Sequence, residues 1–253
     1  VLSQNLQAQS QKKVSGQQLS QKVSFNPKGL WRASFEIKPG TVVPINFEID
    51  NKKTGGLGIT FINADERFEG GNVIQTTDSV IVKLDQFDNE MALKLQGDSL
   101  VGFLRKQDGS GKAIPLSAKK GINYRFKSTG KSANADFSGT YDVTFTSPDG
   151  KAEKTVGLFK QNGNKLSGTF LRVTGDSRYL EGIVEGNDFY LSSFIGSTPS
   201  YYKGSFTADG KITGANISAR GNTPFEGVKN INAALPDATK LTFLKEGYKS
   251  LNF

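Results

Sequence analysis

The chain has 253 residues, a formal net charge of +8 and a hydrophobic content of 36%, with 29 glycines and 18 phenylalanines. It contains no cysteine and no histidine, which excludes thiol redox chemistry, Cys/His zinc sites, Ser-His-Asp triads and histidine acid–base catalysis by this chain. The lysines are scattered rather than massed in one run, and no apolar run is long enough for a transmembrane helix, so neither nucleic-acid binding nor a membrane span is expected.

The first 28 residues are expected to form a flexible polar leader. They are rich in Gln, Ser and Lys and carry almost no periodic apolar positions, a composition that buries too little apolar surface to order the chain. The chain begins without Met and has no apolar signal segment, which we interpret as an export signal that has already been removed.

Residues 29–127 are predicted to form a first β unit. Short apolar runs alternate with polar residues, and turn signals separate the runs roughly every 8–12 residues, which favours an antiparallel sheet. In the run SVIVKL the alternation places Val80, Val82 and Leu84 on a core face and the intervening residues on a wetter face.

A second β unit is predicted over residues 137–228, after a polar, hinge-like segment, Lys127–Asp136. Asn-Gly and Asp-Gly pairs separate several of its apolar runs, and such pairs are strong hairpin signals. The stretch Gly168–Gly196 within it is predicted to be a three-stranded meander, because each connector carries the Gly and Asn or Asp that tight turns favour.

The two units resemble one unit written twice, since matching residues recur about 110 positions apart. The matched pairs are Trp31 with Tyr141, Phe61 with Phe170, Asp65 with Asp176, Arg67 with Arg178, and Gly102 with Gly214. The predicted fold class is therefore all-β, a duplicated antiparallel meander forming two lipocalin-like barrel or sandwich units. The alternative is that unrelated meanders share this pattern by chance.

Residues 229–253 are expected to hold a short helix and a linker. Asp237 is suited to cap the N-terminus of that helix, with Gly247 ending it. Leu251–Phe253 then resembles the start of another strand, which suggests a boundary inside a longer polypeptide.

Asp176, Arg178 and Glu181 cluster at the first bend of the meander. An Asp and an Arg two residues apart at a strand's start can share a sheet face and pair. A structural ion pair or turn cap is the more typical reading, particularly because Arg67 repeats the pattern; the alternative is the polar floor of a ligand pocket. Glycoside hydrolysis by Asp176 with Glu181 or Asp188 is a further alternative. No catalytic residue, metal ligand or cofactor is predicted.

The aromatic residues of the meander and the following strand admit two readings. Rings at Phe189, Tyr190, Phe194, Tyr201 and Tyr202 could stack on a sugar or line an apolar pocket, although such aromatics are more typical of a barrel core. Two bare Gly-x-Gly pieces occur, and neither is expected to precede a helix as a phosphate cradle must.

Several ordered motifs resemble one protein group. They include Gly168-Thr169-Phe170, the run GDSRYLEG at 175–182, Leu191-Ser192-Ser193-Phe194, Trp31-Arg32-Ala33 and Leu235-Pro236-Asp237. They resemble the N-terminal β region of envelope thioredoxin-like proteins of Gram-negative bacteria, in the alkyl hydroperoxide reductase/thiol-specific antioxidant superfamily. Where that group has Phe-Asp-Gly-Ser-His, this chain reads FIGST at 194–198, and Ser177 replaces a usually aromatic residue.

The resemblance implies a non-catalytic accessory region of an exported, periplasmic thiol-disulfide oxidoreductase, whose partner is a C-terminal thioredoxin-like domain with a Cys-x-x-Cys pair. The competing hypotheses are a free-standing β-barrel module that binds an apolar ligand or glycan, and a structural spacer. A small-molecule or peptide ligand is expected to contact Asp176, Arg178, Tyr179, Glu181, Phe194, Trp31 and Arg67.

Overall fold

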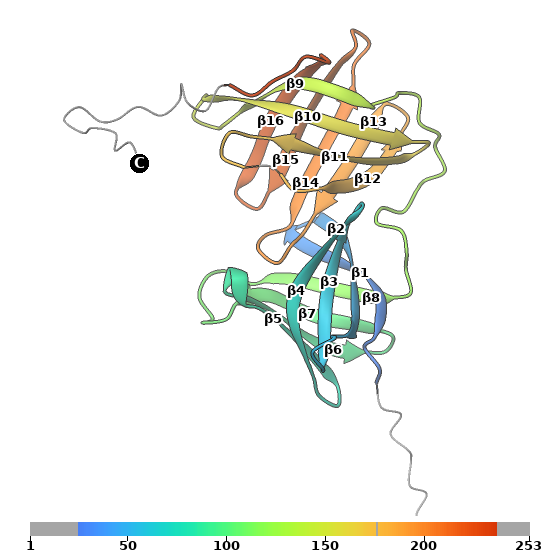
Figure 1. The fold of residues 1–253 in the computed structure, drawn as a ribbon, viewed down its shortest axis with the longest axis vertical. Coiled ribbons are helices and arrows are strands. Elements are labelled where there is room, and N and C mark those ends of the chain that lie inside the picture. The colour runs from blue at the N-terminus through green and yellow to red at the C-terminus, as the bar shows by residue number, and fades with distance from the viewer. Residues whose placement is uncertain (1–24, 176, 237–253) are drawn as a thin grey trace, which may run out of the picture.

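A computed structural model describes residues 25–175 and 177–236, which form two closed antiparallel β-barrels of eight strands each (Figure 1). The predicted all-β, duplicated fold is confirmed, and both units are barrels rather than sandwiches. The predicted C-terminal helix and Asp176 lie outside the described residues. None of the helical segments within these two ranges has the length and apolarity that a bilayer crossing needs.

The first barrel closes because β1 pairs with both β2 and β8. A 3-10 turn, η1 (Asp85–Phe87), connects β5 to β6. The strands are β1 (Gly29–Lys38), β2 (Thr41–Asn51), β3 (Leu57–Asn63), β4 (Glu66–Gln75), β5 (Ser79–Leu84), β6 (Asn89–Gln96), β7 (Ser99–Lys106) and β8 (Ile114–Lys120).

The second barrel closes in the same way, with β9 paired to both β10 and β16. Its strands are β9 (Gly139–Thr146), β10 (Ala152–Asn162), β11 (Lys165–Leu171), β12 (Leu180–Glu185), β13 (Asp188–Ser193), β14 (Ser200–Phe206), β15 (Lys211–Ser218) and β16 (Gly221–Lys229).

The interior of the first barrel is built by the period-two alternation of its strands. Val80, Val82 and Leu84 of β5 are fully buried, as the alternation predicts. Trp31 of β1 stacks on Phe47 of β2 with ring centroids 6.3 Å apart. Large side chains therefore fill this barrel, as is usual for eight strands.

Aromatic rings dominate the interior of the second barrel. The Phe170 ring lies at the centre of the cluster, with ring centroids 5.0–5.4 Å from those of Phe145, Phe159, Tyr202 and Phe225. These rings also meet Tyr141 and Phe189. Edge-on and tilted contacts of this kind fill space densely.

The sequence repeat corresponds to structural equivalence. Gly102 lies in β7 and Gly214 in β15, the seventh strand of each barrel. A Cβ atom at Gly102 would lie 1.9 Å from the carbonyl oxygen of Ala92, and one at Gly214 would lie 2.2 Å from that of Lys203. Both positions require glycine because a neighbouring strand approaches too closely for any side chain.

The described residues that flank the barrels form hydrogen bonds with them. Pro27 accepts a hydrogen bond from Trp31 Nε1 at 2.7 Å, so contacts with the first barrel begin before residue 29. In the hinge-like segment, Asn134 N donates to the carbonyl of Gly186 at 2.8 Å, and Gly186 N donates to that of Ser132 at 3.0 Å. This segment therefore lies along the second barrel, held by backbone hydrogen bonds.

Candidate functional site

The second barrel closes one end of the first. The loop between β13 and β14 meets the end of the first barrel where the β1–β2, β3–β4 and β5–β6 connections lie (Figure 1). Phe194 in this loop is 1% exposed, and its ring centroid lies 4.8 Å from those of both Phe35 and Phe61. Phe194 therefore completes the core of a barrel to which it does not belong in sequence.

Two asparagines of the first barrel hold this loop by its backbone. Asn63 Nδ2 donates to the carbonyl of Phe194 at 3.1 Å, and Phe194 N donates to Asn63 Oδ1 at 3.2 Å. Asn89 Nδ2 donates to the carbonyls of Gly196 and Ser197 at 2.9 and 3.0 Å. Buried backbone groups of the loop are thereby satisfied, as burial requires.

Arg125, in the linker between the barrels, contacts both of them. Its guanidinium donates to the carbonyl of Ile62, to the carbonyl of Ser192 at 2.9 Å, and lies 3.4 Å from Glu181 Oε2. Burial lowers the pKa of Arg125 to about 10, while Glu181 opposes that shift. The guanidinium is therefore still a cation at neutral pH, with one carboxylate as its counter-ion.

The linker is fixed to the first barrel immediately before and at Arg125. Asn46 Nδ2 donates to the carbonyl of Ile122 at 3.2 Å, and Arg32 Nε donates to the carbonyl of Arg125 at 2.7 Å. The barrels and the linker thus form one connected polar joint around a buried cation.

Two residues of the predicted acid–base cluster take part in this joint. Glu181 Oε2 accepts a hydrogen bond from Ala64 N at 2.8 Å in addition to its pair with Arg125. Arg178 pairs with Glu66 of the first barrel and lies 5.6 Å from the ring centroid of Phe68. Through these contacts both residues join the two barrels.

The other predicted ligand contacts are not all accessible. Trp31 and Phe194 are each 1% exposed because their side chains point into the first barrel. Tyr179 is 55% exposed on the loop before β12. Arg67 and Glu181 line a common cleft, so these two are brought together by the fold.

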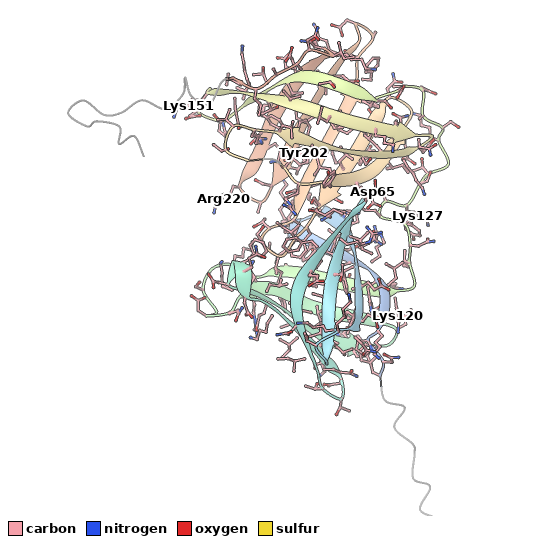
Figure 2. The ribbon with its side chains drawn as sticks, in the orientation of Figure 1. Asp65, Lys120, Lys127, Lys151, Tyr202 and Arg220 are labelled. Carbon is pink, nitrogen blue, oxygen red and sulfur yellow. The ribbon has the colours of Figure 1, made fainter. Side chains whose placement is uncertain are left out.

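This cleft, of about 830 Å³, lies at the junction of the barrels beside the linker. Figure 2 shows Asp65 on the β3–β4 turn at this junction and Lys127 on the linker next to it. Its walls come from β1 to β4, from the linker around Tyr124–Ser128, and from β10 to β12. Strands β10 and β11 contribute Lys160, Asn162, Lys165 and Ser167.

Two buried polar atoms of the cleft-lining residues have no hydrogen-bond partner in the described part of the chain. They are Arg125 Nε, a donor, and Asn46 Oδ1, an acceptor. The side chain of Arg125 is only 1% exposed, and Asn46 is 4% exposed. Unsatisfied buried polar atoms are uncommon in folded proteins and require an explanation.

The cleft has an excess of basic side chains. Five of its lining residues are basic, namely Arg67, Arg125, Lys127, Lys160 and Lys165, and two are acidic, Asp65 and Glu181. Within residues 25–175 and 177–236, no group of His, Cys, Asp and Glu side chains is placed to hold a metal ion. The chemistry offered by the cleft is therefore hydrogen bonding and positive charge.

Sequence reasoning missed the residues that build the joint: Asn46, Asn63, Asn89 and Arg125. The available signals were weak. Asn63 ends an apolar strand and Asn89 begins one, while Arg125 lies between two aromatics in a polar linker. None of these features indicates that the side chain reaches another domain.

No family model matches the chain, and no curated protein matches its sequence. A protein of unknown function from the DUF3598 family of Nostoc punctiforme has 8% identity and a TM-score of 0.26, covering 79% of this chain and 94% of that one. The apo haemoglobin receptor HpuA of Kingella denitrificans has 12% identity and a TM-score of 0.25, covering 88% and 94%. These similarities are too low to assign a function, and the resemblance to thioredoxin-like proteins stays a prediction.

Proposed function

We propose that this chain is a non-catalytic binding module whose ligand site is the cleft between the two barrels. The observation that carries the proposal is a cleft of about 830 Å³ with unpartnered buried polar atoms on Arg125 and Asn46. Small-molecule sites are typically concavities of roughly 300–1,000 Å³ with a few fixed polar groups.

The cleft is a better candidate than the barrel interiors. A lipocalin-like module would hold its ligand in a barrel mouth, but Phe194 closes the mouth of the first barrel that faces the second. The second barrel is filled by the aromatic cluster around Phe170. The interiors of the two barrels are therefore weaker candidates for the ligand site than the cleft.

The lining of the cleft suits a ligand that is polar with an apolar face. Tyr124 is 44% exposed and Phe126 is half-buried, so both lining residues offer aromatic surface. Asn123, Asn162 and Ser167 add hydrogen-bonding groups. In glycan recognition, aromatic side chains typically stack on the sugar ring while polar side chains bind its hydroxyl groups. A purely apolar ligand fits this lining less well.

The walls of the cleft are fixed before any ligand binds. Arg125 contacts both barrels, and Asn46 and Arg32 hold the linker backbone. Pre-organised walls reduce the ordering cost that binding otherwise pays. This rigidity supports a recognition role for the cleft.

The test is a cleft-filling substitution. Asn162 is exposed at the end of β10 and lines the cleft, so Asn162→Trp should obstruct it without changing either core. Gln96→Trp, exposed at the end of β6 and not a lining residue, is the matched control.

A thermal-shift screen against lipids, glycans and peptides should find a stabilising ligand, since binding to the native state raises the melting temperature. The shift should be lost in Asn162→Trp and retained in Gln96→Trp. A stabilising ligand that is unaffected by Asn162→Trp would place the site elsewhere. The absence of any stabilising ligand would contradict a binding role.

A further inference from the structure

We propose that the ligand of this cleft carries an oxyanion, a carboxylate, sulfate or phosphate group, which binds between Lys160 and Lys165 of the second barrel and the linker. This inference rests on the proposed function and specifies its ligand class. The two lysines line the cleft together with Lys127 and Arg67.

Four basic side chains stand at the rim of the cleft. Lys160, Lys165, Lys127 and Arg67 are all exposed, and none of them forms an ion pair within residues 25–175 and 177–236. Arg67 donates instead to the backbone carbonyls of Ala64 and Glu66, at 2.8 and 3.0 Å. Guanidinium and ammonium groups both bind oxyanions well, Arg by paired hydrogen bonds and Lys as a point charge.

The two lysines are placed on one face by the register of the β10–β11 hairpin. Lys160 is opposite Ser167, and Asn162 is opposite Lys165, so the lysines are diagonal neighbours on the outer face. Diagonal positions lie roughly 7–8 Å apart, within mutual reach of long side chains. Two cations without an acid between them repel each other, and an anion between them would relieve that repulsion.

In two other hairpin turns of the same barrel, a lysine forms an ion pair with an acid of its own turn. Lys151 pairs with Asp149 at 3.1 Å, and Lys211 pairs with Asp209 at 2.8 Å, each acid lying two residues earlier in a hairpin turn. The β10–β11 turn has Gly163 and Asn164 instead of an acid. The cleft therefore receives its lysines from a hairpin in which the local counter-ion is missing.

The acids of the cleft do not neutralise this rim. Glu181 is committed to Arg125 and to the amide of Ala64. Asp65 lies on the first barrel, at the β3–β4 turn, and balances at most one of the four rim cations (Figure 2). Beneath the rim, Arg125 Nε is a further cationic donor without a partner in the described ranges.

A second concavity provides an internal comparison. It has a volume of about 510 Å³ and lies on the second barrel, where its lining includes two basic residues, Lys154 and Lys211, and two acidic residues, Asp142 and Glu226. An excess of positive charge is thus a property of the junction cleft, and not of every concave surface on this basic protein.

The experiment measures binding by isothermal titration calorimetry at low salt with four probes. They are a digalacturonate, a disulfated disaccharide, inorganic phosphate, and a neutral disaccharide of matching size. At least one anionic probe should bind, more tightly than the neutral sugar, and the best of the three identifies the oxyanion. Added salt should weaken that binding, because it screens exposed charges.

Two double variants measure the contribution of Lys160 and Lys165 to anion binding. Lys160→Gln/Lys165→Gln should weaken the anionic probe by about tenfold or more, the loss expected for charge-assisted hydrogen bonds. Lys53→Gln/Lys112→Gln removes the same charge from exposed lysines outside the cleft and should change affinity by less than about twofold. Equal losses in both double variants, or no binding of any anion, would overturn the inference.

Failure of this inference and failure of the proposed function give different results. A neutral ligand that binds the wild type, is blocked by Asn162→Trp and is unaffected by Lys160→Gln/Lys165→Gln would reject the oxyanion and leave the cleft as the site. An anion whose affinity is unchanged by Asn162→Trp would reject the cleft itself.

Discussion

The side-chain amide of Asn63 hydrogen-bonds to both backbone groups of Phe194, with distances of 3.1 and 3.2 Å, across the boundary between the two barrels. An amide side chain here imitates the edge of a neighbouring strand. Because it fixes the backbone of Phe194, it also fixes the ring that closes the first barrel. The barrels are therefore joined at one point both by the buried ring of Phe194 and by the hydrogen bonds of Asn63 to its backbone. We call this pair of hydrogen bonds the clasp.

Replacing Phe194 with Ala should destabilise the protein by about 3–5 kcal/mol, the range for deleting a fully buried phenylalanine ring. The ring contacts Phe35 and Phe61, so its loss leaves a cavity at the end of the first barrel. Urea unfolding followed by circular dichroism measures the change. Phe103→Ala, at a ring 48% exposed, should cost less than about 1 kcal/mol. Equal costs at the two sites would contradict the role given to Phe194.

Asn63→Leu should keep the branching of the side chain at Cγ and remove its hydrogen bonds to Phe194. The N–H and carbonyl of Phe194 would then be buried without these partners, at a cost of about 1–3 kcal/mol for each group left unsatisfied. The free energy of unfolding in urea is the appropriate measurement. Asn51→Leu, at the exposed end of β2, is the control. A variant as stable as the wild type would show that the clasp contributes nothing.

Gly102→Ala and Gly214→Ala should have similar effects, because each added methyl group meets a carbonyl oxygen of the adjacent strand. We expect losses of about 1–3 kcal/mol at each site, the usual cost of overpacking. Gly163→Asn is the control, since its φ of +58° suits asparagine and no atom lies within 4 Å. Tolerance at one glycine and not the other would contradict the equivalence of the barrels.

Glu90→Gln should remove the part of the free energy of unfolding that depends on ionisation of this carboxyl group. Hydrogen bonds from Lys83 and Arg105 hold the pKa of Glu90 below its usual 4.5. Since the folded pKa is the lower one, the stabilisation is complete above pH 4.5 and is lost as pH falls through the folded pKa.

The Glu90→Gln variant should therefore be less stable than the wild type at pH 7, by about 1–2 kcal/mol, since its cationic partners are partly exposed. The difference should shrink as the pH falls below the usual carboxyl range. Melting temperatures between neutral and acidic pH measure it, with Glu48→Gln, exposed on β2, as control. A stability difference between Glu90→Gln and the wild type that does not change with pH would contradict a stabilising role for ionised Glu90.

The architecture follows from local rules, and for that reason it could be predicted. Alternation puts Val80, Val82 and Leu84 inside, and the recurrence of Gly102 at Gly214 marks the duplication. Each of these features depends on neighbours in one strand or one hairpin. The choice between barrel and sandwich depends on β1 pairing with β8, a contact that no local pattern specifies.

The joint could not be predicted from the sequence, because its contacts connect residues that are distant along the chain. A core position is typical for an aromatic residue such as Phe194, but the sequence cannot show that this core belongs to the other barrel. Arg125 gives no signal in its own segment, because its partners Ile62, Glu181 and Ser192 are distant in sequence. Charge counting likewise finds scattered lysines and misses that the fold gathers five basic side chains around one cleft.

The resemblance to the N-terminal region of exported thioredoxin-like proteins stays a prediction. It rests on motifs such as the run GDSRYLEG at 175–182. The coding sequence downstream of Phe253 tests it, since a Cys-x-x-Cys pair within the next strand–helix unit is expected. A stop codon there would reject the thioredoxin-like parent and would leave the cleft proposal unaffected.

The most direct test of the account is nuclear magnetic resonance mapping of the bound site. Titration of isotope-labelled protein with digalacturonate, or with whichever oxyanion probe binds best, should shift amides within residues 62–67, 123–128, 160–167 and 181–183, which contain most of the cleft lining. The interiors of both barrels should show small changes. Shifts confined to barrel interiors, or to surfaces outside these four segments, would contradict the claim that the junction cleft is the binding site.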